Sequence, residues 1–139
     1  RVMRCLSSIY GIDIDQENVD YTRRRLRDIV EWHMHSQLNT RDASVGFFRS
    51  VDAVLATNII RANTLTDAGR IELVEYRPTQ SCSFLREWSF LAGKEPSSQL
   101  DLFAAPREPK RDLAPIRYSH LGTTPEPMPT QSPIDGVSA

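Results

Sequence analysis

The stretch from residue 8 to residue 19 constrains the fold most strongly, because it is typical of a short strand that ends on a carboxylate and leads directly into a helix. Its apolar residues are β-branched or aromatic, the types that strands favour, and these are Ile9, Tyr10, Ile12 and Ile14. Gly11 allows a neighbouring backbone to approach closely. Asp15 is expected to cap the helix by accepting a hydrogen bond from a free amide group of its first turn.

Asp13 is thereby placed at the carboxyl end of the expected strand. Open α/β sheets with parallel strands bind their ligands at that edge. An ionised carboxylate only accepts hydrogen bonds, so it suits the paired hydroxyls of a ribose. A strand-to-helix turn in which Asp13 and Asp15 are simply solvated is an alternative that explains these residues equally well.

The composition favours one domain, since the chain has 139 residues and a net charge of −1. A net charge this close to zero gives no indication of a nucleic-acid or membrane partner. No apolar run approaches the roughly 18 residues of a membrane span, and no signal peptide is visible, so we expect a cytoplasmic protein without membrane contact. Cys5 and Cys82 match no metal-ligand spacing. We expect them to be reduced thiols in the core, and we expect no metal site.

The proline distribution divides the chain into two parts. Eight of the nine prolines lie at or after Pro96, and the last residues are rich in Pro, Ser and Thr. Such a segment has too little apolar surface to offset its chain entropy. We therefore expect a folded α/β domain over residues 1–92 and a largely disordered tail over residues 93–139.

Hydrophobic periodicity within residues 1–92 predicts short strands with covering helices. A first helix is expected over residues 16–35 and a second over 43–56, which Thr57 and Asn58 should end. Strands are expected at 59–60 and 71–76. Residues 83–92 fit either a strand or a short helix, and periodicity does not decide between the two.

The first expected helix carries a cluster of arginines at positions 23, 24, 25 and 27. A charge run on a helix is most often its solvated face. The alternative is a phosphate-facing patch, for which arginine has the right chemistry, and the candidate nucleic-acid-binding residues are then Arg23, Arg24 and Arg27.

Two segments resemble conserved blocks of class I S-adenosylmethionine-dependent methyltransferases, in particular adenine-specific DNA methyltransferases of restriction-modification systems. They are Ile-Tyr-Gly-Ile-Asp-Ile-Asp at residues 9–15, with the helix after it, and Asn-Ile-Ile-Arg-Ala-Asn-Thr-Leu at residues 58–65. The resemblance implies a Rossmann-like sheet in which Asp13 and Ile14 hold the ribose of S-adenosylmethionine. It further implies that Asn63 faces the adenine, with Thr64 also in the cofactor site, and that DNA is the partner.

The departures from this family are specific. No glycine stands among the eight residues before Ile9, where a glycine-rich loop should hold the methionine part of the donor. Ala62 and Asn63 replace the usual Gly-Asp, and no Asn-Pro-Pro-aromatic or Asp-Pro-Pro-aromatic segment is present to hold a flipped adenine. We therefore expect no catalytic residues and a truncated or degenerate protein, a modification subunit or fragment that is inactive alone and needs a partner subunit for the missing motifs.

Two other functions fit the same residues. The first is a non-catalytic module that binds nucleic acid or a protein subunit through the helix face from Arg23 to Arg27 and the tail. The second is a nicotinamide-nucleotide domain, which would also place Asp13 on a ribose but needs the same absent glycine loop.

Overall fold

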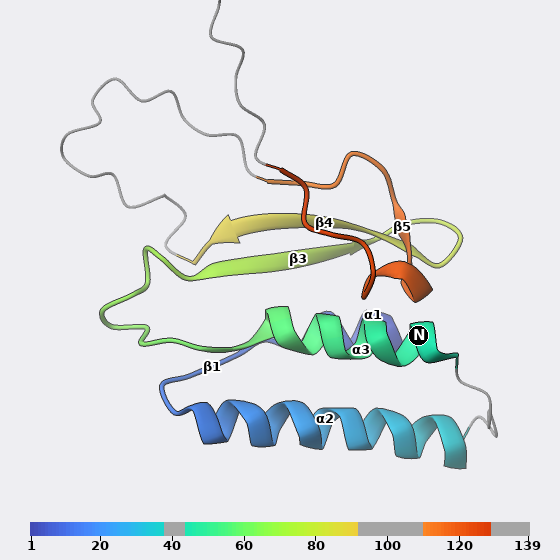
Figure 1. Ribbon diagram of the computed structural model, residues 1–139, viewed down its shortest axis with the longest axis horizontal. Coiled ribbons are helices and arrows are strands. Elements are labelled where there is room, and N and C mark those ends of the chain that lie inside the picture. The colour runs from blue at the N-terminus through green and yellow to red at the C-terminus, as the bar shows by residue number, and fades with distance from the viewer. Residues whose placement is uncertain (38–43, 92–109, 129–139) are drawn as a thin grey trace, which may run out of the picture.

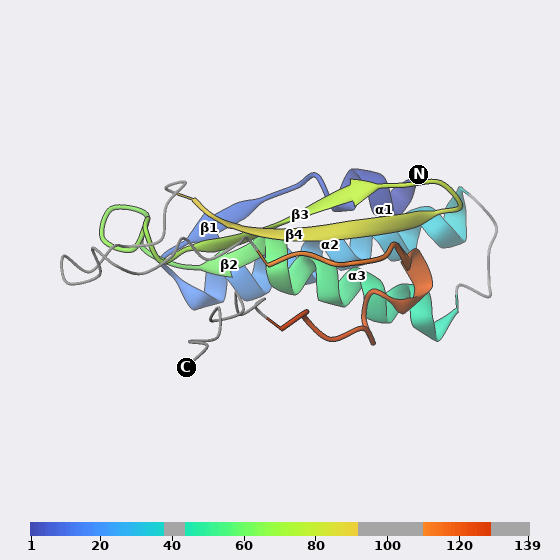
Figure 2. The ribbon, with the colours of Figure 1, turned by 90° about the horizontal axis from the view of Figure 1, so that it is seen from above.

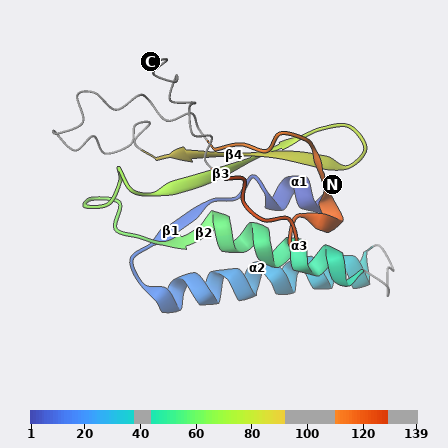
Figure 3. The same ribbon diagram turned by 45° about the horizontal axis from the view of Figure 1, so that its top comes forward.

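The computed structural model describes residues 1–37, 44–91 and 110–128, whose helices and strands are stacked in layers (Figure 1). Helices α1 (Val2–Leu6) and α3 (Val45–Asn58) lie between an antiparallel sheet on one side and helix α2 (Gln16–Ser36) on the other (Figure 3). The structure is thus mixed α and β.

Strands β1 (Gly11–Asp13) and β2 (Ile59–Arg61) form a parallel pair in which Asp13 is aligned with Arg61. This confirms short parallel strands with covering helices. The first strand is shorter than expected, because Ile9, Tyr10 and Ile14 lie outside it and are exposed.

Helix α2 agrees with the expected 16–35, and its start is capped as predicted. The Asp15 carboxylate accepts a hydrogen bond from the Glu17 amide at 2.8 Å. The apolar side that faces the protein includes Val19 and Val30, which are buried. Local sequence therefore determines this helix, through a capping residue and apolar positions at helical spacing.

Helix α3 begins after Ser44, whose hydroxyl accepts from the Phe47 amide at 3.2 Å. The helix ends at Asn58, within the predicted break at Thr57 and Asn58 and two residues later than the expected 56, and it leads directly into β2. Asn58 is tolerated there because its buried side-chain amide donates to the backbone carbonyl of Ser7 at 3.1 Å, so a contact outside the helix satisfies it.

The antiparallel sheet contains β3 (Glu72–Pro78), β4 (Ser83–Phe90) and β5 (Ile116–Arg117), with β4 in the middle. Residues 83–90 are therefore a strand. Their side chains alternate in burial, and those buried against the helices or the C-terminal segment are Phe84, Arg86 and Trp88. The tight turn before β4 places Ser81 and Cys82 at positive φ, 60° and 56°.

The expectation of a disordered tail over 93–139 requires a correction for residues 110–128, which pack against the domain. Figure 2 shows this segment alongside β4, where the Trp88 amide donates to the Lys110 carbonyl at 2.8 Å. Leu121 is buried, and the Gly122 amide donates to the Ser50 hydroxyl at 3.2 Å. The composition predicted disorder for this segment because it reflects only the number of apolar residues. Hydrogen bonds of this kind between distant residues are not visible in it. The rest of the expected tail lies outside the described residues.

The core joins all these layers, from Met3 and Leu6 of α1 to Trp88 of β4 and Leu121 of the C-terminal segment. Cys5 and Cys82 are not part of it. Both are free thiols and both are exposed, so the prediction that they fill the core is wrong. Cys5 lies in α1 beside the buried Met3 and Leu6 but on the solvent side, and Cys82 lies in the tight turn.

Candidate functional site

The carboxyl ends of β1 and β2 meet at one edge of the parallel pair. There the Ala62 amide donates to the backbone carbonyl of Asp13 at 2.9 Å. Asn63 and Thr64 follow Ala62 in the chain. Of the predicted cofactor-binding positions, Asp13 is therefore the last residue of β1, and Asn63 is the second residue after the adjacent strand β2. The parallel register brings them to the same edge, as the sequence predicts.

The Asp13 carboxylate is held by local hydrogen bonds. Its Oδ1 accepts from the Asp15 amide at 2.8 Å, and its Oδ2 accepts from the Asn18 side-chain amide at 3.1 Å. These contacts determine the direction of the side chain at the start of α2. An ionised carboxylate offers about four lone-pair sites, so each oxygen of Asp13 keeps capacity for a further donor such as a hydroxyl.

The neighbouring candidates differ in how they are held. Ile14 exposes 62% of its surface, while its carbonyl accepts from the Arg61 guanidinium at 3.0 Å. The Asn63 side-chain oxygen accepts from the Leu65 amide at 3.0 Å and so turns back into its own loop. Thr64 is exposed. The edge therefore presents an oriented carboxylate, an exposed apolar side chain and a loop amide.

Two of the three predicted nucleic-acid-binding arginines serve contacts within the protein. Arg23 donates from Nε to the Ile59 carbonyl at 2.8 Å and from a terminal nitrogen to the Ala56 carbonyl at 3.1 Å, which ties α2 to the end of α3. Arg27 pairs with Asp52 at 2.9 Å and lies over the Phe48 ring at 5.1 Å. Arg24 is exposed and has no side-chain partner within residues 1–37, 44–91 and 110–128. Nucleic-acid binding by these residues remains a prediction.

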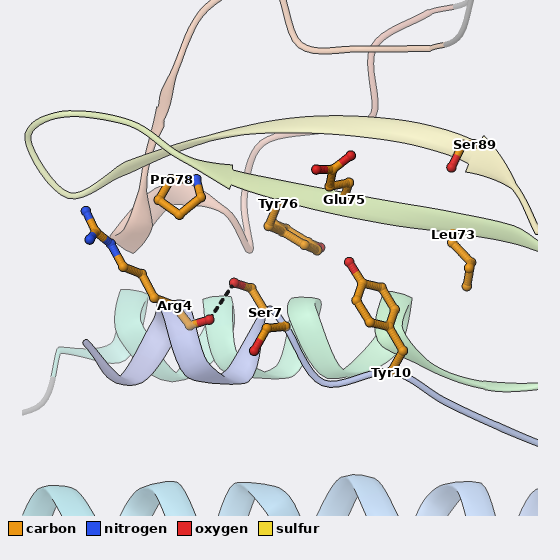
Figure 4. A pocket seen from close by; sticks show the side chains of 9 residues that line it. Arg4, Ser7, Tyr10, Leu73, Glu75, Tyr76, Pro78 and Ser89 are labelled. Carbon is orange, nitrogen blue, oxygen red and sulfur yellow. Dashed lines mark hydrogen bonds between the residues drawn. The ribbon is translucent and has the colours of Figure 1, made fainter.

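Sequence reasoning did not anticipate a cavity of about 530 Å³ between α1 and β3 (Figure 4). Arg4 of α1 and Ser7, which follows that helix, line one side, and Glu75 and Tyr76 line it from β3. Tyr10 also lines it, and its hydroxyl donates to the Val74 carbonyl at 2.9 Å. None of the four predicted cofactor-binding residues lines this cavity.

The two tyrosines that line this cavity both have raised pKa values, which favours the neutral phenol. Burial, and secondarily the Glu75 carboxylate, raise the pKa of Tyr10 above its ordinary value. Burial also raises the pKa of Tyr76, and its hydrogen bond with the Thr57 hydroxyl at 2.7 Å partly opposes the shift. Both phenols therefore remain hydrogen-bonding groups at neutral pH, and neither acts as a base there.

Raising the pH above 10 is expected to destabilise the fold through Tyr76. Its folded-state pKa lies above the ordinary 10.0, so the folded protein binds this proton more strongly than the unfolded chain. That contribution is fully present below the unfolded pKa and is lost as the pH rises through the folded pKa. The urea midpoint, measured from about pH 9 to about pH 11, should fall more steeply in the wild type than in Tyr76→Phe. Equal slopes would contradict the assignment.

The described part of the chain contains no group of three or more His, Cys, Asp or Glu side chains arranged to hold a metal ion. Within the same ranges, every helix is too short or too polar to cross a membrane. No protein-family model matches the sequence, and neither a curated protein sequence nor a solved structure matches it.

Proposed function

We propose that this chain is an S-adenosylmethionine-binding, DNA adenine methyltransferase-like protein, a modification subunit or fragment that does not transfer methyl groups alone. The parallel pairing of β1 with β2 carries the proposal. Through that pairing, the two residues that the family resemblance assigns to ribose and adenine lie near the carboxyl ends of adjacent strands, Asp13 at the end of β1 and Asn63 two residues after β2. A Rossmann-like sheet binds its ligand at such an edge.

The chemistry of this edge suits the adenosyl part of the donor. The free lone pairs of the Asp13 carboxylate can accept from two ribose hydroxyls. The exposed Ile14 side chain offers an apolar surface for a purine ring. The Asn63 side-chain oxygen, which uses one lone pair on the Leu65 amide, can accept a second hydrogen bond from an adenine amine.

The methionine part of the donor has no comparable partner in this chain. Residues 1–10 contain no glycine, so they supply no glycine-rich loop that could approach the methionine carboxylate. When it is bound, S-adenosylmethionine supplies an activated methyl group. This chain has no Asn-Pro-Pro or Asp-Pro-Pro segment to present an adenine amine to it. We therefore assign the chain to binding, with a partner subunit or longer parent as the source of the catalytic segment.

Titration calorimetry with S-adenosylmethionine tests the proposal. We expect the full chain to bind it at millimolar ligand, and to bind adenosine with an affinity within about tenfold, because the contacts are made to the adenosyl group. Asp13→Asn keeps the size of the side chain and its acceptor for the Asp15 amide but removes the charge. We expect this variant to bind about 10- to 100-fold more weakly, the value of hydrogen bonds to an ionised group.

Glu17→Gln is the matched control, since it removes one carboxylate from the first turn of α2, four residues from Asp13. Its affinity should equal that of the wild type. Absence of heat at millimolar ligand, or equal loss of affinity in the Asp13 and Glu17 variants, would remove the proposal, because the second result would reflect the general charge of the helix start.

The alternative of a nucleic-acid-binding module finds less support in the contacts. Arg23 and Arg27 already donate to groups on α3, in β2 and within α2. A phosphate would have to displace these bonds. On this helix face, direct DNA binding would therefore depend on Arg24 and its neighbour Arg25, with the tail as the other part of this alternative.

A further inference from the structure

The outer face of α2 exposes large apolar side chains on the side away from the core. Tyr21, Ile29 and Trp32 expose 64%, 50% and 61% of their surface. In Figures 1 and 3, α2 is the outermost layer, with α3 on one side of it and no described element on the other. Large apolar side chains gathered on one exposed helix face are typical of a protein interface.

Tyr21 and Trp32 belong to a regular stripe with spacings of three and four residues, which places its members along one line of the helix. Its central members are Tyr21, Arg25, Asp28 and Trp32. Val19 and Val30, the buried residues of α2, lie on the opposite side. Spacings of four, three and four residues are those of the seam between two packed helices.

The stripe is complementary to itself when a second helix runs antiparallel to it. If the twofold axis lies between positions 26 and 27, Tyr21 of one copy faces Trp32 of the other, and Arg25 faces Asp28. The symmetry repeats both contacts, so each pair occurs twice. In heptad terms, Tyr21 and Asp28 occupy d positions, and Arg25 and Trp32 occupy a positions. Each contact therefore pairs a d position of one helix with an a position of the other, the arrangement found between antiparallel helices.

Arg25 and Asp28 are available for such contacts. Both are exposed, and neither has an ion pair or side-chain hydrogen bond within the described parts of the chain. By contrast, Arg27 on the adjacent side of the helix pairs with Glu31 and Asp52. The charged centre of the stripe, Arg25 and Asp28, thus has no partner among the described residues.

We propose that two copies of this chain associate through the outer faces of their α2 helices, antiparallel, with Tyr21 against Trp32 and Arg25 against Asp28. A nucleic-acid partner is less favoured, because α2 is electrically balanced. Its four arginines are offset by four acidic residues, namely Glu17, Asp20, Asp28 and Glu31. A polyanion would meet the acidic residues along with the basic ones, whereas a second copy places Arg25 against Asp28 at both central contacts.

Sedimentation velocity of the full chain tests the proposal. One helix face per copy makes a small interface, so we expect dimers with a dissociation constant of about 10–100 μM. Arg25→Asp places two aspartates opposite each other across the axis, and Asp28→Arg does the same with two arginines. Each variant alone should dimerise at least about tenfold more weakly.

The decisive experiment is sedimentation velocity of a mixture of the two variants. A chain with Arg25→Asp and a chain with Asp28→Arg are complementary at both central contacts, so the mixture should form heterodimers although neither component self-associates. Arg70→Asp, at an exposed arginine in the loop after β2, is the matched control and should dimerise like the wild type. All three positions are exposed, so unchanged circular dichroism should accompany each change.

Three results would overturn the proposal. The first is a wild type that stays monomeric up to about 500 μM, well above the expected dissociation constant. The second is single variants that self-associate like the wild type, and the third is a mixture of the two variants without heterodimers. A monomeric protein that shifts duplex DNA, with loss of the shift at high salt and in Arg25→Asp, would assign the face to nucleic acid instead. None of these outcomes depends on binding of S-adenosylmethionine.

Discussion

Asp112→Ala is expected to lower the free energy of unfolding by about 3–5 kcal/mol, because it leaves the buried Arg86 guanidinium without its counter-charge. The two side chains expose only 7% and 6% of their surface and form a bidentate pair, with N–O distances of 2.9 and 3.0 Å. Arg86 also donates to the carbonyls of Thr124 and Pro125. This cluster therefore attaches two parts of the C-terminal segment to β4.

Urea unfolding of Asp112→Ala, followed by circular dichroism, measures the effect. Glu126→Ala is the matched control, because it removes an acidic residue from the same segment. Glu126 pairs with Lys110 at 2.9 Å, but its side chain is 59% exposed, so we expect a loss of about 1 kcal/mol or less. Similar losses for the two variants would show that the buried pair does not hold the segment.

A double variant separates the charge from the packing. Arg86→Met combined with Asp112→Leu removes both charges and keeps apolar volume. Its loss should be smaller than the sum of the two single losses, since no unpaired charge remains buried. Additive losses would mean that the pair acts only through its contacts with other groups.

Phe47→Ala is expected to destabilise the protein by a comparable amount, about 3–5 kcal/mol, through the cavity that it leaves in the core. Phe47 is 7% exposed. Its ring meets that of Phe48 at 5.3 Å and that of Tyr118, in the 3-10 turn η1 (Tyr118–His120), at 6.3 Å, both edge to face. The side chain thus joins α3 to the C-terminal segment.

Phe48→Ala is the control for this second prediction, since it removes the same side chain from the next position of α3. Phe48 is only partly buried and contacts Arg27 through its ring face at 5.1 Å. We expect its loss to be about half that of Phe47→Ala, in proportion to the smaller area buried. Equal or larger destabilisation by Phe48→Ala in urea unfolding would contradict the packing described for Phe47.

The candidate site could be predicted from sequence in part. The parallel pair and the positions of Asp13 and Asn63 follow from β-branched runs that end on polar residues before a helix or a loop. The hydrogen bonds that orient Asp13 involve Asp15 and Asn18, residues close enough in the chain to anticipate. The cavity beside α1 could not be predicted, because Tyr10 reaches Val74, 64 residues away, only in the folded chain.

The roles of the arginines show the same limit. Arg23, Arg24 and Arg27 are equivalent in the sequence, as members of one charged run on a helix. In the structure, Arg23 and Arg27 donate to α3 or its end, and Arg24 remains exposed. Which arginine is free depends on how α2 packs against α3, and helical periodicity alone does not determine that packing.

By itself, the sequence determined the elements whose causes are local: the capped start of α2, its length, and the extended segments at β1, β2 and β3. Caps and side-chain spacing act within a few residues, so they can be recognised without a fold. Only the tertiary structure decided that residues 110–128 are ordered, that Cys5 and Cys82 are exposed, and that Arg86 and Asp112 are buried together. Those outcomes depend on contacts between distant parts of the chain, where a polar residue is stabilised by a partner that composition does not reveal.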